Sequence, residues 1–454
     1  MKVHLIAIGG SAMHNLAIAL HKKGITVTGS DDEIVDPAKS NLKRYGILPA
    51  TEGWDVSRIT ADIDAVILGM HATADNPELK RAQELKLKIY SYPEYLYEQT
   101  KDKTRVVIGG SHGKTTITAM VLHAMRYNNK QFDYLVGAAL EGFETSLHLS
   151  HEAPVAIFEG DEYLASTLDK RPKFLLYKPQ IALISGIAWD HVNVFPTYRS
   201  YLEQFENFVK QMPEGGALVY CDADEEVRKL AALIPNGVKK IPYGLPEYTV
   251  ENGITTWKES WGTTQLEVFG QHNLLNLNGA KQICQLLGLT DKQFLQAIAS
   301  FKGAARRLQT VARTPQCTVY WDFAHSPSKL KATIQAVKEQ FPNRKLVACM
   351  ELHTFSSLTK EFLKEYIGTM DMADIRKVYF NPHVIEHKRL AAINPDEVKQ
   401  AFGGNVEVYT DSAKMIGDLK AMQWKDTNLL MMSSGNFDGV NIKSFAEELL
   451  QIKN

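Results

Sequence analysis

The sequence has few cysteines, and their arrangement suggests neither a cross-link nor a metal site. The four cysteines are far apart and form no C-x-x-C pair: Cys221, Cys284, Cys317 and Cys349. Such spacing argues against a disulfide framework and against a zinc site. We therefore expect four reduced thiols, most of them buried.

Long apolar runs and an excess of one charge are also missing. No stretch reaches the roughly 18 apolar residues of a membrane-spanning helix. The run Val3–Ile8 ends in Gly9 and Gly10 rather than in a small-residue cleavage site, which predicts a buried strand and not a signal peptide. The formal net charge is −1, so no global field favours nucleic acid or membrane. These absences predict a cytoplasmic protein that binds neither.

The chain does contain alternating strand and helix patterns over 454 residues. This alternation predicts an α/β fold with mainly parallel sheets, and the length suggests about three domains. A polar stretch near residue 100 and the segment Gly303–Arg307 suggest the boundaries, which gives domains 1–102, 103–305 and 306–454. The expected strands include Val3–Ile8, Thr26–Gly29, Ala65–Leu68, Arg105–Ile108, Val155–Phe158, Ile181–Ser185, Ala217–Tyr220, Thr318–Trp321, Lys345–Met350, Lys377–Phe380, Val406–Tyr409 and Asn428–Ser433. The expected helices include Ala12–Lys22, Ile117–Arg126, Asn273–Leu287 and Lys329–Gln340.

The strongest motif is a glycine-rich turn between an apolar strand and a helix. Its residues are Gly109, Gly110, Ser111, His112, Gly113, Lys114, Thr115 and Thr116. Backbone N–H groups in such a turn and at the helix N-terminus can hold phosphate oxygens. Lys114 would reach the outer phosphates, and the hydroxyl of Thr115 would ligate Mg²⁺. The motif therefore predicts an ATP site that spans Gly110–Thr116.

Two later strands end in residues that suit a metal at the same sheet edge. Glu159 follows the strand Val155–Phe158 within the segment E-G-D-E-Y, and Mg²⁺ prefers hard oxygen ligands such as carboxylates. Asp190-His191 follows the strand Ile181–Ser185, and a neutral imidazole could ligate a second metal. Thr115, Glu159 and His191 are thus the predicted metal ligands.

Taken in order, these segments resemble the Mur ligase family, whose pattern is G-T-H-G-K-T-T, E-x-D-E, D-H and G-x-H-N-x-x-N. The last motif appears here as Gly270–Asn276. The resemblance implies that Asn273 and Asn276 flank the adenine and that Arg307 contacts the transferred phosphate. It also implies that Asp322 approaches the nucleotide ribose or positions the closed domain. It also implies catalytic roles for Lys114, Glu159, His191 and Arg307, and three domains: a Rossmann-like N-terminal, a P-loop ATPase-like central and a Rossmann-like C-terminal domain.

The N-terminal segment Ile6–Met13 matches the family's muramoyl-binding signature I-G-I-G-G-T-G-M in part. Ala7 and Ala12 replace two glycines, and the G-x-G-x-x-G of a nicotinamide site is absent. Asn76-Pro77-Glu78 also recurs in the family. The resemblance implies that the UDP-linked substrate contacts Gly9, Gly10, Ser11, Ser30, Asp31 and His71.

The family resemblance implies an ATP- and Mg²⁺-dependent ligase that activates the lactoyl carboxylate of UDP-N-acetylmuramate as an acyl phosphate and transfers it to an amine. The segments E-G-D-E-Y and D-K-R-P-K-F resemble the members that attach the tripeptide L-Ala-γ-D-Glu-meso-diaminopimelate during peptidoglycan recycling. Those that attach L-alanine are the nearest alternative. Two segments depart from the family pattern, Ser185-Gly186 and Glu351–Leu358, and we expect the second to receive the amine. No lysine occurs between His191 and Lys210, so a carbamylated lysine bridging the metals is not expected.

Three other functions compete with this interpretation. A non-catalytic sensor of ATP and UDP-sugar is disfavoured by the complete set of metal and adenine motifs. A relative of folylpolyglutamate synthase would lack a separate UDP-binding domain at the N-terminus. A Rossmann dehydrogenase would bind NAD, for which the glycine pattern is missing.

Overall fold

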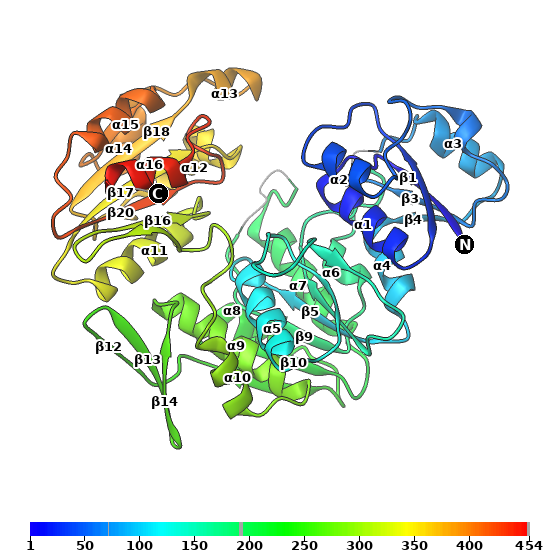
Figure 1. Cartoon of the computed structure of the whole chain (residues 1–454), viewed down its shortest axis with the longest axis horizontal. Coiled ribbons are helices and arrows are strands. Elements are labelled where there is room, and N and C mark those ends of the chain that lie inside the picture. Colours follow the sequence, from blue (N-terminus) through cyan, green and yellow to red (C-terminus); the bar gives the residue numbers. More distant parts are fainter. Residues whose placement is uncertain (71, 190–193, 452–454) are drawn as a thin grey trace. The chain divides into compact units, whose positions relative to one another are not determined.

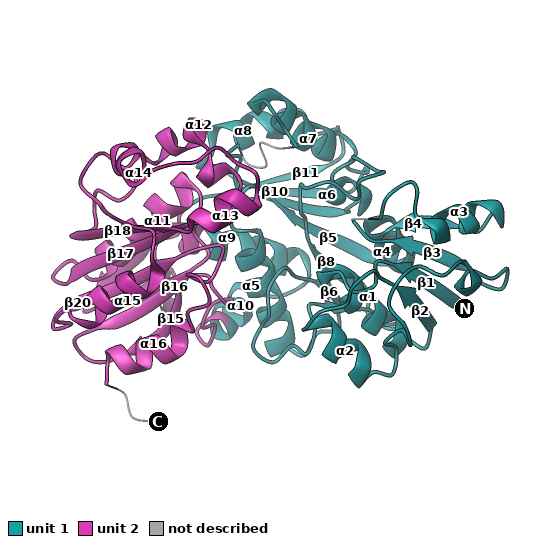
Figure 2. Ribbon diagram, turned by 90° about the horizontal axis from the view of Figure 1, so that it is seen from above, with its two compact units in different colours: residues 1–244, 276–297 teal, residues 245–275, 298–454 magenta. Residues whose placement is uncertain are grey.

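A computed structural model describes residues 1–70, 72–189 and 194–451. It divides into two compact units, Met1–Gly244 with Asn276–Ala297 and Leu245–Leu275 with Ile298–Asn454; both are traced in Figure 1 and coloured separately in Figure 2. Helices alternate with mainly parallel strands throughout, which confirms the predicted α/β class. No helix within the described ranges is both long and apolar enough to cross a bilayer.

The N-terminal part of the first unit is a parallel four-stranded sheet in the order β2-β1-β3-β4. All four residues of β3 are buried, as expected for a parallel strand covered on both faces. The first strand was predicted to reach Ile8, but β1 ends at Ile6 because Ala7 has a φ of +65°. The strands and helices are β1 (Lys2–Ile6), α1 (Ser11–Lys22), β2 (Thr26–Ser30), α2 (Ala38–Arg44), the 3₁₀ turn η1 (Val56–Arg58), β3 (Ala65–Leu68), α3 (Pro77–Glu84), β4 (Ile89–Ser91) and α4 (Tyr92–Thr100).

The central part is a seven-stranded sheet in the order β11-β10-β9-β5-β8-β6-β7, parallel except for the pair β6–β7. Its strands are β5 (Thr104–Gly109), β6 (Asp133–Leu135), β7 (Leu147–His148), β8 (Val155–Glu159), β9 (Ile181–Ile184), β10 (Ala217–Cys221) and β11 (Lys239–Tyr243). The chain leaves β5 to one side and returns on the other, and ligands bind at such a switch point in open α/β sheets. Ile108 pairs with Glu159, and Gly109 pairs with Ile184, so three strands end side by side.

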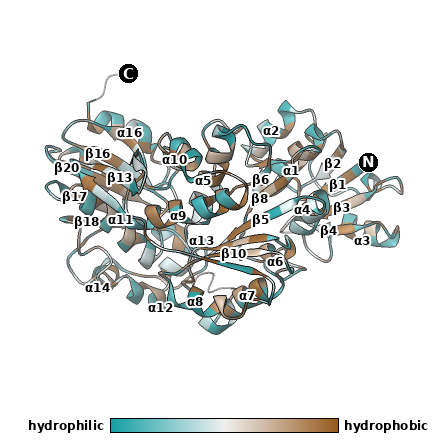
Figure 3. Cartoon of the chain, turned by 90° about the horizontal axis from the view of Figure 1, so that it is seen from below, coloured by the Kyte–Doolittle hydropathy of each residue, from teal (hydrophilic) through white to brown (hydrophobic). Residues whose placement is uncertain are grey.

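Apolar side chains fill the space between the central sheet and its helices, and the central strands are mainly brown in Figure 3. Phe174 and Phe208 stack with their ring centroids 4.5 Å apart, which joins α6 to α7. Thr197 and Ser200 form a capping box that starts α7. The helices are α5 (Lys114–Tyr127), α6 (Lys173–Leu176), α7 (Tyr198–Lys210), α8 (Glu225–Ala231), α9 (Gln271–Leu286) and α10 (Asp291–Ile298).

Arg105, at the start of β5, fixes the segment that joins the N-terminal and central parts. Arg105 is 5% exposed, and within the described part of the chain its guanidinium donates hydrogen bonds to main-chain carbonyls. Those carbonyls belong to Thr100, Lys101, Lys103, Tyr177 and Lys178, at 2.8–3.1 Å. The polar stretch near residue 100 is therefore bound to the start of the central sheet.

The second unit begins with an antiparallel sheet that the sequence analysis did not predict. It consists of β12 (Tyr248–Glu251), β13 (Ile254–Glu259) and β14 (Gly262–Leu266). Asn252 and Gly253 join the first two strands with positive φ angles of 52° and 75°. An Asn-Gly pair between alternating strands is the standard signal of a two-residue hairpin, so this hairpin could have been predicted from the sequence.

The C-terminal part of the second unit is a six-stranded sheet in the order β15-β16-β20-β17-β18-β19, in which only β15 is antiparallel to its neighbour. The strands are β15 (Gln309–Arg313), β16 (Thr318–Asp322), β17 (Lys345–Leu352), β18 (Ile375–Phe380), β19 (Glu407–Tyr409) and β20 (Thr427–Met432). Around them lie α11 (Pro327–Gln340), η2 (Ser356–Leu358), α12 (Lys360–Leu363), η3 (Lys364–Tyr366), α13 (Pro382–His387), α14 (Pro395–Ala401), α15 (Ser412–Lys420) and α16 (Ile442–Leu449).

Candidate functional site

The turn between β5 and α5 has the backbone shape of a phosphate-binding loop. Gly110 and Gly113 have φ angles of +129° and +78°, which favour glycine. Gly113 is the N-cap of α5, so the amides of the first helical turn, which have no acceptor within the helix, point toward the glycine-rich turn. The turn holds the predicted ATP contacts in one continuous segment: Gly110, Ser111, His112, Gly113, Lys114, Thr115 and Thr116.

Acceptors surround the ammonium group of Lys114. Its Nζ lies 2.6 Å from the carbonyl oxygen of Gly110 and 2.6 Å from Oε2 of Glu162. Burial opposes the charge of Lys114, but Glu162, Asp161 and Glu159 raise its pKa above the ordinary value. Lys114 therefore stays charged at the turn. Sequence reasoning assigned no role to Glu162, although its motif contained it.

A second cation stabilises the same acidic segment. Nζ of Lys173, in α6, lies 2.6 Å from Oδ2 of Asp161. Burial of Asp161 opposes its ionisation, but Lys173 and Lys114 together hold the pKa of its carboxyl below the usual range. The D-K-R-P-K-F segment thus contributes directly to the charge balance beside the phosphate loop.

Thr115 and Glu159 meet where a magnesium ion would be expected. The hydroxyl of Thr115 donates to Oε1 of Glu159 at 2.7 Å, and the amide of Gly137 donates to Oε2 at 2.6 Å. A hydroxyl and a carboxylate are hard oxygen ligands, and Mg²⁺ usually takes one or two carboxylates together with several waters. The pair therefore fits Mg²⁺. Within the described ranges, no three His, Cys, Asp or Glu side chains gather into a larger metal cluster.

His191, the third predicted metal ligand, and Asp190 beside it lie outside the described residues, so the role of His191 stays a prediction. The segment that leads to them contacts the phosphate loop. Ser111 N donates to the carbonyl of Gly186 at 2.9 Å, and the hydroxyl of Ser185 donates to the carbonyl of His112. A side chain at residue 186 would collide with the His112 ring. The Ser185-Gly186 departure from the family pattern therefore gives His112 its space.

Helix α9 carries both asparagines of the G-x-H-N-x-x-N motif. Asn276 lies next to the phosphate loop, because a Cβ atom at Gly113 would collide with its amide. Asn273 is one turn earlier, and its Nδ2 donates to the carbonyl of Phe269 at 2.9 Å. Both asparagines are buried, with 5% exposure for Asn273 and 8% for Asn276. Their contacts with adenine stay predictions.

The N-terminal turn between β1 and α1 is occupied by a carboxylate. The amide of Gly9 donates to Oδ2 of Asp31 at 2.7 Å. Burial raises the pKa of Asp31 to about 6, and the neighbouring carboxyl of Asp32 adds to this rise. Gly10 and Ser11 continue into the start of α1. His71 lies outside the described residues.

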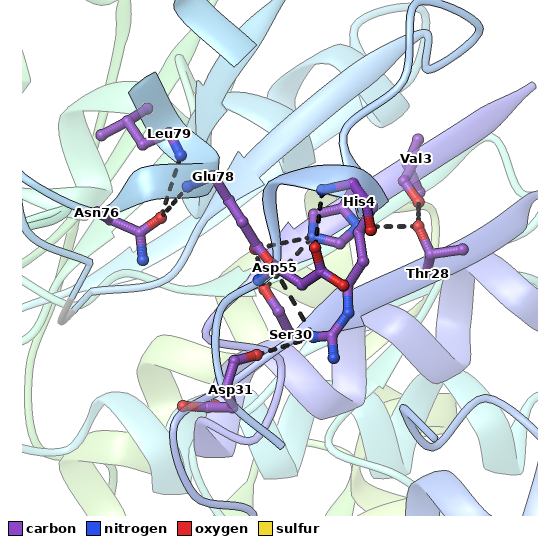
Figure 4. A network of polar contacts seen from close by, with 12 residues as sticks. Val3, His4, Thr28, Ser30, Asp31, Asp55, Asn76, Glu78 and Leu79 are labelled. Atoms are coloured by element: carbon purple, nitrogen blue, oxygen red, sulfur yellow. Dashed lines mark hydrogen bonds and ion pairs between the residues drawn. The ribbon is translucent and has the colours of Figure 1, made fainter. Parts of the chain in front are cut away.

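Ser30 is held inside the N-terminal sheet by a buried network, shown in Figure 4. Its hydroxyl donates to Oε2 of Glu78, and Nε2 of His4 lies 3.2 Å from the same oxygen. All three side chains have 0% exposure. Burial opposes the charge of Glu78, but His4, Ser30 and the amide of Asp55 lower its pKa. Glu78, which sequence reasoning left without a role, thus anchors the strand end that carries Asp31.

Arg307 and Asp322 lie in the second unit. The Arg307 guanidinium is stacked over the Phe323 ring at 4.7 Å, and its Nη1 donates to the carbonyl of Arg306 at 3.1 Å. Oδ2 of Asp322 accepts a hydrogen bond from Thr333 at 2.7 Å. These contacts are structural, and the roles of both residues toward ATP stay predictions.

Polar groups surround Glu351 at the carboxyl ends of β17 and β20. This buried carboxylate accepts from the hydroxyl of Ser433 and from the amide of Phe437 at 2.8 Å, and Nδ1 of His353 is 3.7 Å away. Burial opposes its charge, but these partners lower its pKa. Arg306 donates to the carbonyls of Ser433 and Gly435 at 2.9 and 2.5 Å.

Family models match most of the chain in three segments. The Mur ligase family catalytic domain matches residues 2–104, the Mur ligase middle domain matches 108–284, and the Mur ligase glutamate ligase domain matches 306–435. These three matches confirm the predicted three-domain architecture.

Similar proteins cover nearly the same length. The UDP-N-acetylmuramate–L-alanyl-γ-D-glutamyl-meso-2,6-diaminoheptandioate ligase of Escherichia coli is 26% identical over 98% of this chain and 97% of its own. The UDP-N-acetylmuramate–L-alanine ligase of Ligilactobacillus salivarius is 30% identical over 82% of this chain and 81% of its own. The crystal structure of the UDP-N-acetylmuramate–alanine ligase from Thermotoga maritima, 21% identical, aligns with a TM-score of 0.69 over 99% of this chain and 98% of its own. The chain belongs to the Mur ligase family of ATP-dependent, carbon–nitrogen bond-forming ligases.

Proposed function

We propose that this ligase joins the lactoyl carboxylate of UDP-N-acetylmuramate to the amino group of L-Ala-γ-D-Glu-meso-diaminopimelate, as an enzyme of peptidoglycan recycling. The observation that carries the proposal is the meeting of Lys114, Thr115 and Glu159 at one sheet edge. Two observations favour the tripeptide as acceptor. The D-K-R-P-K-F segment, which resembles that of tripeptide-attaching members, contacts Asp161 beside the phosphate loop through Lys173. The Escherichia coli relative is named for that acceptor.

The reaction follows from the charges at this edge. The substrate carboxylate attacks the γ-phosphorus of ATP, and the bond between that phosphorus and the oxygen bridging to the β-phosphate breaks. The products of this step are ADP and an acyl phosphate. Lys114 neutralises charge on the transferred phosphoryl group. In phosphoryl transfer, positioning and charge stabilisation provide most of the catalysis. Thr115 and Glu159 would hold Mg²⁺, which supplies further positive charge when bound. The amine then attacks the acyl carbon, loses a proton, and phosphate leaves.

The C-terminal sheet edge supports a site for the amine substrate. Glu351 is fixed by Ser433 and Phe437, and His353 stands beside it. A buried carboxylate and an imidazole can accept from an ammonium group or orient a peptide amide. We assign the acceptor to this edge, in agreement with the expectation for Glu351–Leu358.

Acceptor profiling tests the proposal. The purified enzyme is given ATP, Mg²⁺ and UDP-N-acetylmuramate with either L-alanine or the tripeptide, and ADP release is followed. We expect kcat/KM to be at least about a hundredfold higher with the tripeptide, because discrimination by several buried polar contacts reaches that size. Preference for L-alanine would instead assign the chain to the alternative function. Nucleotide binding without ADP release would indicate a sensor.

Removing the Glu159 carboxylate tests the metal assignment separately. Glu159→Ala should lower kcat by about a hundredfold or more, because a ligand of the ion that neutralises the phosphates is lost. The matched control is Glu152→Ala, which removes an exposed carboxylate shortly before the same strand. Full activity of Glu159→Ala at saturating magnesium would remove Glu159 from the scheme.

A further inference from the structure

A buried phenol lies behind the phosphate loop, and the chemistry described so far does not use it. Tyr201 is in the first turn of α7 and has 0% exposure. Its hydroxyl oxygen is 3.0 Å from Oε1 of Glu162 and 3.0 Å from Oγ of Ser111. The ring packs edge-to-face against Phe195 and Phe205, with centroids 5.5 and 5.3 Å apart. Tyr201 therefore connects the phosphate loop to the carboxylate that holds Lys114.

The direction of each hydrogen bond follows from the groups involved. Glu162 is paired with the Lys114 ammonium at 2.6 Å, and an ionised carboxylate only accepts, so the Tyr201 hydroxyl donates to it. Oγ of Ser111 accepts from the amide of Ala188 at 2.7 Å. The Ser111 proton then points to the Tyr201 oxygen at 3.0 Å rather than to the carbonyl of Gly186 at 3.4 Å.

These bonds form one directed chain. It runs from the Ala188 amide through the hydroxyls of Ser111 and Tyr201 and ends at the Glu162 carboxylate, which also accepts from the Lys114 ammonium on its other oxygen. Bonds aligned in this way polarise one another in a buried environment. Among the described residues, Oε1 of Glu162 accepts from Tyr201 and Oε2 accepts from Lys114. The phenol thus constrains the rotation of the carboxylate.

We propose that Tyr201 is a positioning residue of the phosphate loop, which orients Glu162 and through it sets where Lys114 lies when the γ-phosphate is transferred. Without the phenol, Oε1 loses one buried donor, and a constraint that keeps the carboxylate from turning both oxygens toward the ammonium is removed. Lys114 would then be held away from the phosphate. The inference rests on ATP-dependent ligation by this family and not on which amine is the acceptor.

The test is Tyr201→Phe, which removes one oxygen and keeps the ring. We expect kcat for ADP release to fall about tenfold, the effect of one misplaced charge-assisted hydrogen bond. The KM for UDP-N-acetylmuramate and the affinity for MgADP should stay within about twofold, because Lys114 acts on the transferred phosphate. MgADP binding by calorimetry does not require the acceptor to be known, so a wrong acceptor assignment would not imitate this pattern.

The matched control is Tyr177→Phe. The Tyr177 phenol is also fully buried, its ring lies 5.1 Å from Phe158, and its hydroxyl has no hydrogen-bond partner in the described part of the chain. It should leave kcat unchanged. A Tyr201→Phe enzyme whose kcat falls less than twofold, or only as much as its folded fraction measured by MgADP stoichiometry, would overturn the proposal.

A double-mutant cycle separates positioning from a general loss of packing. If Tyr201 acts through Glu162, then Tyr201→Phe should change kcat by less than about twofold in a Glu162→Gln background. Effects of the two substitutions that multiply independently would show that the phenol acts by another route, and the proposal would fail.

Discussion

The first unit contains two turns of the same type, strand to glycine turn to helix, and their charges are opposite. The turn after β5 contributes a cation, Lys114, to the place where anionic phosphates are expected. The turn after β1 contributes no cation, and its Gly9 amide is bound to the carboxylate of Asp31. The same order of elements therefore presents a cation where a triphosphate is predicted in one case and holds an acidic side chain in the other. A glycine-rich turn allows the chain to reverse between strand and helix, whereas the neighbouring side chains decide what the turn can bind.

The difference between the two turns is tested most strongly by removing the cation of the central turn, Lys114. Lys114→Met should lower kcat by about a thousandfold, because the charge that stabilises the transferred phosphate is lost from a preorganised site. Lys130→Met, which changes an exposed lysine shortly after the same helix, is the control. Steady-state ADP release measures both. A Lys114→Met enzyme that keeps a tenth of the wild-type kcat would show that the turn works without its cation.

The glycine of the central turn can be tested against a glycine with the same backbone angle. Gly113 and Gly215 both have a φ of +78°, but only a side chain at Gly113 meets a neighbour, the amide of Asn276. Gly113→Ala should raise the KM for ATP at least about tenfold, whereas Gly215→Ala should cost only about 1–2 kcal/mol of unfolding free energy from the backbone. Equal KM values in the two variants would mean that the contact with Asn276 does not matter for ATP.

The N-terminal turn should respond to pH through Asp31. Since burial raises the pKa of Asp31 from 3.8 to about 6, the folded protein binds this proton more tightly than the unfolded chain does. The stabilisation is complete below pH 3.8 and is lost as the pH rises through 6. Urea unfolding should show the wild type losing about 1–2 kcal/mol relative to Asp31→Asn between these values. Parallel curves would mean that Asp31 titrates normally.

The smallest expected effect concerns the residue that begins the N-terminal turn. Ala7 has a φ of +65°, a conformation that costs an alanine more than a glycine. Ala7→Gly should raise the free energy of unfolding by about 0.5 kcal/mol, because relief of this strain outweighs the extra freedom of glycine in the unfolded chain. Thermal denaturation would detect the change. A destabilised variant would indicate that the methyl group of Ala7 packs usefully against its surroundings.

The strands of the fold were predictable because parallel sheets leave a clear trace in the sequence. Ala65–Leu68 has the predicted limits, and Val155–Glu159 and Ile181–Ile184 differ from the prediction by a single residue, since uninterrupted apolar runs mark strands buried on both faces. The antiparallel strands near Asn252 were missed because they are half exposed and alternate weakly with polar residues. Only their turn residues could have revealed them.

The candidate site was predictable where its chemistry lies in one continuous segment. The Gly110–Thr116 turn needs only local geometry, and Glu159 follows from the end of a neighbouring strand. Tyr201 could not be found in this way, because a tyrosine in an amphipathic helix reads as a core residue and its partners are 39 and 90 positions away in the chain. The partner of the Gly9 amide likewise depended on the side-chain direction of Asp31, which spacing does not specify.

Arg105 has a consequence for how the first unit unfolds. Its guanidinium binds three carbonyls in the passage from α4 to β5 and two just after α6. Opening that passage would leave a buried positive charge without partners. The passage therefore couples the unfolding of the N-terminal part to that of the central part. Calorimetry of the first unit's unfolding should therefore give one cooperative transition, which an Arg105→Lys exchange, with fewer and less directed donors, would begin to split.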